Sequence, residues 1–196
     1  MNKVNQEALD VMLAKGRTQN TWLDEPVQDE TLKELFNNLR WGPTSMNCQP
    51  ARILFLRTHE AKERLKPALL PGNVDKTLNA PVVAVIGYDL DFPEHLPRMF
   101  AHNKDAKKLY EGKDAFIEAT AFRNSSLQGG YFILTARAMG LGTAPMSGFN
   151  NAVVNETFWP DGKIKSNFLC ALGYADESKT FPRGDRFAFD EVCTLL

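Results

Sequence analysis

RWGPTSMNCQPARILFLR, residues 40–57, changes character abruptly in its middle. Residues 42–50 place glycine, proline, hydroxyl and amide side chains close together, whereas residues 53–56 are continuously apolar. Glycine and proline commonly end helices, and a short apolar run behind such residues is typical of a buried strand. The stretch therefore predicts a helix that ends near Gly42, then a loop, then a strand over residues 52–57. The loop is either an ordinary turn or a set of donors that holds a ligand.

Periodic apolar residues on both sides of this loop predict the remaining elements. Helical spacing predicts helices over residues 4–12, 29–39, 60–69 and 115–139. Asp29, Thr58 and Asn150 are the expected N-caps, the last for a further short helix. Apolar, β-branched runs predict strands over 82–88 and 167–174, and Pro71-Gly72-Asn73 predicts a turn. Residues 89–114 predict an irregular segment with short helical pieces, which either covers a site or is a solvated insertion.

The order of these elements favours an α+β fold, or a mixed sheet under helices, in one domain over residues 1–196. No repeat, linker or composition shift divides the chain. The helix over 115–139 carries apolar residues on more than one side, which predicts a place in the core or at a subunit interface. The last twenty or so residues lack a core pattern, and we expect them to wrap around a neighbour.

Composition and charge exclude several classes of function. The formal net charge is −1, which favours neither nucleic acid nor an anionic membrane as a partner. The N-terminus lacks the apolar core of a signal peptide, and no stretch is long and apolar enough for a membrane helix, so a cytoplasmic location is expected. Three scattered cysteines and three scattered histidines give no disulfide framework and no metal spacing.

Polar and cationic residues that could bind a ligand are dispersed along the chain. No phosphate-binding glycine loop of the familiar kinds and no nucleophile elbow is present. Arginines near both ends could clamp one phosphate, because a guanidinium matches its geometry, and amides and hydroxyls could read a planar heterocycle. Solvated surface charge is the alternative. The residues concerned are Arg17, Thr18, Thr44, Ser45, Asn47, Gln49, Asn73, Lys76, Pro145, Met146, Ser147, Gly148, Arg183 and Arg186.

Five segments of the chain, in order, resemble the nitroreductase family of flavoproteins. PTSMNCQP at 43–50 is similar to that family's P-S-S-x-N-x-Q-P signature. Arg17-Thr18, the NVDK before the APVV strand, GLGTAPMSGF at 140–149 and Arg183-Gly-Asp-Arg186 are similar to its other conserved segments. WGPTSxNC, FRNSS and PMSGF look most like the subgroup that reduces malonic semialdehyde to 3-hydroxypropionate in pyrimidine breakdown.

The resemblance implies an α+β nitroreductase-like fold, with a mixed or antiparallel sheet flanked by helices. The long helix would lie at the interface of a homodimer with shared FMN sites, and the C-terminal segment would extend onto the partner. Carried over by position, Arg17, Arg183 and Arg186 would hold the FMN phosphate. The other implied contacts are Thr18 near the phosphate and ribityl chain, Asn73 and Lys76 at the pyrimidine edge, Pro145, Met146, Ser147 and Gly148 along the ring, and Pro43, Thr44, Ser45 and Asn47 from the other subunit.

The resemblance further implies that hydride passes from NADH or NADPH through FMN N5 to a small-molecule acceptor by a ping-pong cycle. Malonic semialdehyde is the candidate acceptor, with nitroaromatic or quinone reduction as a side activity. No catalytic side chain is expected, and Arg123 is a candidate for the substrate carboxylate. A flavin-binding protein without turnover, or a flavin-consuming or dehalogenating member, is the alternative. Two departures from the family pattern, Asn20 and Ser147, leave the detailed hydrogen bonding open.

Overall fold

A four-stranded antiparallel sheet forms the centre of the molecule, which is described over residues 2–196 by a computed structural model. The strand order is β1-β2-β4-β3, and every neighbouring pair is antiparallel. The sheet is therefore purely antiparallel, and the mixed alternative is wrong. The strands are β1 (Ala51–Leu56), β2 (Val82–Asp89), β3 (Gly142–Met146) and β4 (Ile164–Gly173).

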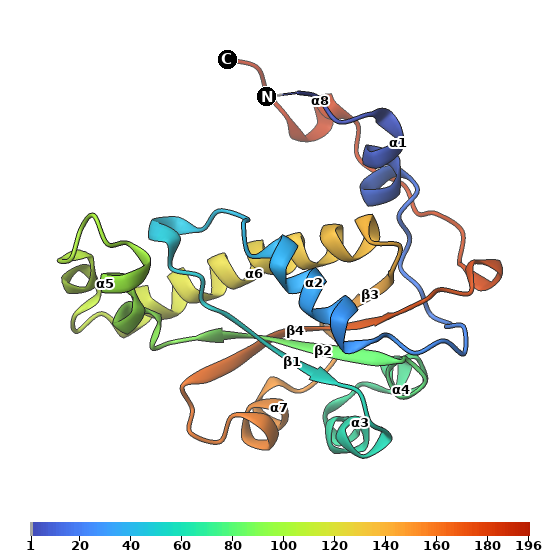
Figure 1. Cartoon of the computed structure of the whole chain (residues 1–196), viewed down its shortest axis with the longest axis horizontal. Coiled ribbons are helices and arrows are strands. Elements are labelled where there is room, and N and C mark those ends of the chain that lie inside the picture. The colour runs from blue at the N-terminus through green and yellow to red at the C-terminus, as the bar shows by residue number, and fades with distance from the viewer. Residues whose placement is uncertain (1) are drawn as a thin grey trace.

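Helices cover both faces of this sheet. Helices α2 and α6 lie over one face, and α3, α4 and α7 lie over the other (Figure 1). A π-helical turn, Asp10–Ala14, continues α1. The helices are α1 (Gln6–Leu9), α2 (Asp29–Leu39), α3 (His59–Leu65), α4 (Pro71–Leu78), α5 (Leu96–Met99), α6 (Asp114–Ala138), α7 (Asn151–Phe158) and α8 (Phe189–Val192).

Strand β2 is buried along its whole length, because it has a strand on each side and helices on each face. Side chains alternate between the faces of a strand. Val83 and Val85 accordingly pack under α3, α4 and α7, whereas Val82, Ala84 and Ile86 pack under α2 and α6. This two-sided burial explains why the sequence of β2 is uniformly apolar rather than alternating.

Two of the predicted helix caps are confirmed. The Thr58 hydroxyl accepts from the Ala61 N–H at 3.1 Å, and Asn150 Oδ1 accepts from Val153 at 3.3 Å. Asp29 is not a cap, because Gln28 holds that position and α2 begins at Asp29 itself.

The turn predicted at residues 71–73 is wrong, because α4 begins at Pro71. A proline fits the first turn of a helix, where its missing N–H has no partner to lose. Strand β3 was not predicted. Its sequence, GTAPM, is short and contains glycine and proline, but it pairs with β4 along its whole length.

Apart from Phe132, helix α6 buries mainly small and polar side chains, and it exposes several large apolar ones. Its buried stripe includes Asn124, Ser125 and Gln128. Phe122 and Leu127, by contrast, keep 50% and 44% of their surface exposed. Within this chain, apolar side chains on more than one side of the helix therefore lie exposed.

The two ends of the chain leave the body together. Figure 1 shows α1 and α8 next to each other, beyond the end of α6 and away from the sheet. Residues 181–196 are exposed throughout. Residues 89–114 form only short helical turns, as expected, and pack as a lobe against the start of α6. No helix among residues 2–196 has the length and apolar character needed to cross a membrane.

Candidate functional site

Four arginines from three separate parts of the chain line one cleft of about 740 Å³, which we call the arginine cleft. Arg17 follows the first helical segment, Arg137 lies in the last turn of α6, and Arg183 and Arg186 belong to the C-terminal segment. Thr18 lines the same cleft. The structure therefore brings together all the residues predicted to surround a phosphate, and it adds Arg137 to them.

The arginines of this cleft donate to backbone carbonyls rather than to carboxylates. Arg17 donates to Phe181 O, and Arg183 donates back across the cleft to Ala14 O at 2.5 Å. Arg186 donates to the carbonyls of the two residues before it, at 3.0 and 2.7 Å. Within residues 2–196, none of the four arginines forms an ion pair. A concave surface with several unneutralised guanidinium groups attracts an anion.

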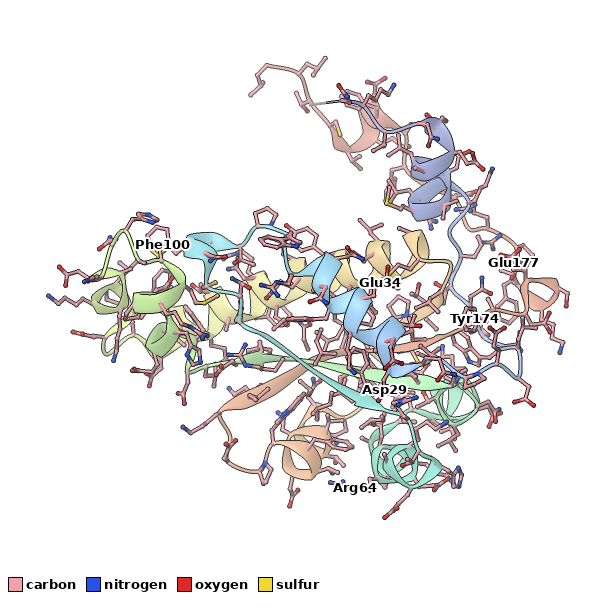
Figure 2. All side chains as sticks on the ribbon, in the orientation of Figure 1. Asp29, Glu34, Arg64, Phe100, Tyr174 and Glu177 are labelled. Atoms are coloured by element: carbon pink, nitrogen blue, oxygen red, sulfur yellow. The ribbon has the colours of Figure 1, made fainter. Side chains whose placement is uncertain are left out.

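Arg137 is the residue of this cleft that the sequence interpretation missed. Its Nη1 donates to Met12 O at 3.1 Å, while its Nε is buried without a hydrogen-bond partner in residues 2–196. Burial lowers the pKa of Arg137, and the positive charge of Arg183 lowers it further. A second cleft, of about 610 Å³, also has Arg17 and Arg137 in its wall. Figure 2 labels Tyr174 and Glu177 from that wall, at the end of the molecule opposite Phe100.

Beside these clefts, the segments predicted to approach a flavin ring meet one another. The 17–22 segment runs next to β3 through a bridge between Thr18 and Thr143. Trp22 Nε1 donates to Lys76 O at 3.3 Å, which joins the same segment to α4. The 17–22 segment therefore contacts both β3 and α4. These three parts of the chain carry the predicted residues Arg17, Thr18, Asn73, Lys76 and 145–148.

Asn73 and Gly148 form the closest contact within this group. Asn73 Nδ2 donates to Gly148 O at 2.8 Å, and a Cβ on residue 148 would lie 2.5 Å from that nitrogen. Only glycine leaves space for this approach. The Asn73 amide N–H₂ is thus engaged in holding the 145–148 segment against α4.

Lys76 and Met146 differ in what they can present to a ligand. Lys76 is partly buried, has no ion pair in the described chain, and has its pKa lowered by burial. The charged form of such an ammonium group is stabilised when a negative charge approaches it. The Met146 side chain lies in the core, where its sulfur accepts from the Thr77 hydroxyl at 3.6 Å, so only its backbone can take part in a site. Ser147 is exposed.

The loop after α2, residues 43–49, is the most unusual backbone in the molecule. Met46, Asn47 and Gln49 have φ of 52°, 50° and 40°, and no other non-glycine residue in 2–196 has a positive φ. Each such residue costs roughly 1–3 kcal/mol, and such conformations cluster at functional sites. Because the strained residues lie in the stretch with the densest polar donors, the loop is more than a connection between α2 and β1.

Side chains of α6 form hydrogen bonds with the backbone of this loop and of the residue that follows it. Asn124 Oδ1 accepts from the Ser45 N–H at 2.8 Å, and Gln128 Oε1 accepts from the Ala51 N–H at 2.9 Å. Tyr131 donates its hydroxyl to Pro43 O at 2.9 Å. On the other side, Asn47 Nδ2 donates to Met99 O in the 89–114 lobe at 2.8 Å.

Within one chain, this loop does not meet the arginine cleft. Asn124 and Arg137 are 13 positions apart on α6 (137 − 124), which places them about 20 Å apart along the helix axis at a rise of 1.5 Å per residue. Arg123 is exposed next to Asn124 and forms no ion pair among residues 2–196. None of Pro43, Thr44, Ser45 and Asn47 lines the arginine cleft.

Cys48, a residue of this loop, is buried against the 89–114 lobe. Burial raises the pKa of its thiol to about 11, so the reactive thiolate is disfavoured at neutral pH. Its surroundings are those of a small core residue.

Comparison with known proteins identifies the group to which the chain is related. The model of the "Nitroreductase family" matches residues 14–174. A protein of Polynucleobacter asymbioticus named "Putative NADH dehydrogenase/NAD(P)H nitroreductase" is 53% identical over 193 residues, which are 98% of each chain. A Ralstonia pickettii protein of the same description is 51% identical and covers 96% of this chain and 97% of its own.

Solved structures of low sequence identity share the fold. A Bacillus subtilis nitroreductase superposes with a TM-score of 0.89 at 22% identity, covering 98% of this chain and all of that one. A nitroreductase of Exiguobacterium sibiricum, solved in complex with FMN, superposes with a TM-score of 0.87 at 16% identity, with both chains fully covered. With a family model that spans most of its length and close relatives that cover it end to end, the chain belongs to the nitroreductase family.

Proposed function

We propose that this protein is an FMN-dependent NAD(P)H oxidoreductase whose FMN phosphate lies in the arginine cleft. The observation that carries the proposal is the convergence of four arginines without a carboxylate partner within residues 2–196. A phosphate monoester fits such a set, because it offers about two negative charges and several acceptor oxygens. The family membership, the relatives' names and the FMN complex of the Exiguobacterium protein support the same assignment.

Each of the converging segments has a role toward the cofactor in this proposal. Arg17, Arg183 and Arg186 neutralise the phosphate, and Thr18 donates next to it. Asn73 keeps the 145–148 segment against α4, so that the backbone of these residues faces the ring. Lys76 stabilises negative charge at the pyrimidine edge, since a partly desolvated ammonium interacts strongly with an anion.

FMN, when bound, supplies the redox chemistry by accepting a hydride from NADH or NADPH and passing it to the acceptor. The chain's own residues bind and orient. This division of labour accounts for the absence of any side-chain nucleophile or metal spacing in the sequence. It also accounts for the inert environment of Cys48.

The second part of the proposal is a homodimer that completes each site with the partner's loop at residues 43–47. In one chain, no residue of that loop lines the arginine cleft. The apolar side of α6, with Phe122 and Leu127, and Trp41 beside the loop are exposed in the single chain. Large apolar side chains that are exposed in one chain are candidates for burial in a protein interface. The exposed C-terminal segment extends onto the partner in the same arrangement.

For the acceptor we propose a small oxidised molecule, with malonic semialdehyde as the first candidate and nitroaromatics or quinones as side substrates. Arg123 is the candidate partner for a substrate carboxylate, because it is exposed and unpaired within residues 2–196, next to the residue that holds the loop. A flavin-binding protein of the same fold without turnover is the alternative.

Steady-state kinetics test the proposal and separate it from this alternative. With NADPH or NADH as donor, and malonic semialdehyde, nitroaromatics and quinones compared by kcat/KM, we expect turnover with at least one acceptor. Parallel initial-velocity lines are expected, because donor and acceptor use one pocket in turn. Intersecting lines contradict the shared pocket, and absence of turnover with every acceptor favours the binding protein.

A further inference from the structure

We propose that Arg137 is a fourth phosphate-binding residue, supplied by α6 from within the fold rather than by the two ends of the chain. The inference rests on the proposed FMN site. Arg17, Arg183 and Arg186 lie on segments outside the long helices, near the two ends of the chain, whereas Arg137 is fixed on the longest helix. It lines both the arginine cleft and the neighbouring one.

The guanidinium of Arg137 occupies the space that the missing side chain of Gly16 leaves free. A Cβ on residue 16 would lie 2.7 Å from Arg137 Nη1 and 2.9 Å from its Cζ. Any larger residue would therefore displace the charged group itself. With the glycine, Nη1 reaches Met12 O at 3.1 Å and the planar group lies directly beneath the backbone that leads into Arg17. The close approach of Gly16 thus places the positive charge of Arg137 next to the segment that carries Arg17, where we propose that the cofactor phosphate binds.

Helix capping does not account for Arg137. An arginine in the last turn of a helix commonly bonds the free carbonyls there. In α6 those carbonyls already accept from backbone N–H groups: Ala136 O from Leu141 at 2.9 Å, and Arg137 O from Gly140 at 3.0 Å. The side chain turns away from its own helix, toward the N-terminal segment.

The charge of Arg137 is costly unless an anion is present. Its Nε is buried and unpartnered in residues 2–196, it has no carboxylate, and burial together with Arg183 lowers its pKa. A partly desolvated cation next to another cation destabilises the protein without a ligand. A phosphate bound in the cleft offsets both the burial of Arg137 and its repulsion by Arg183, because its negative charge stabilises both cations. Removing the charge should therefore weaken binding of a phosphorylated ligand and should not weaken the ligand-free protein.

Binding of FMN and of riboflavin, which lacks the phosphate, tests this role. The variants are Arg137→Met, which keeps the length of the side chain, and Arg137→Lys, which keeps the charge. The control is Arg64→Met on α3, at the opposite side of the sheet (Figure 2). Flavin affinity is measured by fluorescence titration, and unfolding of the flavin-free protein is measured in urea.

We expect Arg137→Met to lower FMN affinity by at least about tenfold, the effect of losing one charge-assisted hydrogen bond, with riboflavin affinity unchanged and flavin-free stability not reduced. Arg137→Lys should fall in between, and Arg64→Met should match the wild type in its affinity for both flavins. Equal losses for both flavins, or a full FMN preference in Arg137→Met, overturn the role of Arg137. Wild-type protein that binds neither flavin overturns the proposed function as well.

Discussion

Replacing Asn124 by alanine tests whether α6 holds the strained loop at residues 43–49. Asn124 is 4% exposed, and its Oδ1 accepts from the Ser45 N–H at 2.8 Å. The residues that follow, Met46, Asn47 and Gln49, keep positive φ values without being glycine. Strained conformations persist only where the surroundings over-determine them. We therefore expect Asn124→Ala to release the loop.

The size of the effect follows from the lost hydrogen bond. Because the Ser45 N–H is only partly buried, loss of its acceptor costs about 1 kcal/mol, the net contribution of a typical hydrogen bond. Alanine is a better helix former than asparagine and returns roughly 0.6 kcal/mol. The control Asn38→Ala, at an exposed position of α2, contains only this second contribution. We expect Asn124→Ala to be less stable than the control by about 1 kcal/mol, or about 2–4 °C in Tm for a chain of this size.

Urea unfolding and hydrogen exchange give the two readouts. Asn124→Ala should unfold at lower urea concentration than Asn38→Ala, and the Ser45 amide should exchange faster while amides of β2 stay protected. Equal unfolding midpoints together with an unchanged Ser45 exchange rate would refute the reasoning. That result would mean that the loop keeps its conformation without help from α6.

Three further predictions address the cofactor site, the packing of the loop and the response to pH. Arg186→Ala should lower FMN affinity by at least about tenfold in a fluorescence titration, and unchanged affinity would remove this residue from the phosphate site. Gly42→Ala should cost about 1–3 kcal/mol in urea unfolding, because the new Cβ lies 2.1 Å from the Tyr131 ring, whereas Gly72→Ala, with nothing within 4 Å, should be unaffected by contacts. Burial raises the pKa of Cys48 from 9.0 to about 11, so its stabilising effect is complete below pH 9 and is lost as the pH rises toward 11. The free energy of unfolding should fall by up to about 1.4 kcal/mol per pH unit in that window, and Cys48→Ala should show a shallower slope; an identical slope contradicts the assignment.

Local patterns in the sequence predicted most of the elements, because their signals are short-range. The uninterrupted apolar run at 82–88 predicted the central strand, and the capping residues Thr58 and Asn150 predicted where two helices begin. Strand β3 was missed, because its pairing with β4 compensates for a sequence of poor strand propensity. The helix at Pro71 was read as a turn, since proline and glycine give the same signal in both.

The buried polar stripe of α6 could not be predicted, because the helical periodicity of a sequence is read from its apolar residues, which are assumed to form the buried face. Several large apolar side chains of this helix, such as Phe116, Phe122 and Leu127, lie exposed, and its buried side combines Phe132 and small residues with amides and hydroxyls. Asn124 in the FRNSS motif is one of these. Only the tertiary structure shows which backbone group it meets.

The candidate site likewise contains some residues that the sequence predicted and others that only the structure reveals. The resemblance to a family pointed to Arg17, Thr18, Arg183 and Arg186, and the structure places all four in one cleft. Arg137 lies outside the segments that carry the resemblance and was missed, since its role depends on how closely Gly16 approaches the end of α6. The distance of the 43–47 loop from the cleft could likewise be found only in three dimensions.

The visible absorbance of the purified protein tests the central claim most directly. Protein reconstituted with FMN and freed of excess cofactor should keep about one FMN per chain, since each arginine cleft binds one phosphate. Under anaerobic conditions, NADH or NADPH should bleach the flavin bands, and an oxidised acceptor should restore them. A protein that remains colourless after reconstitution contradicts the account.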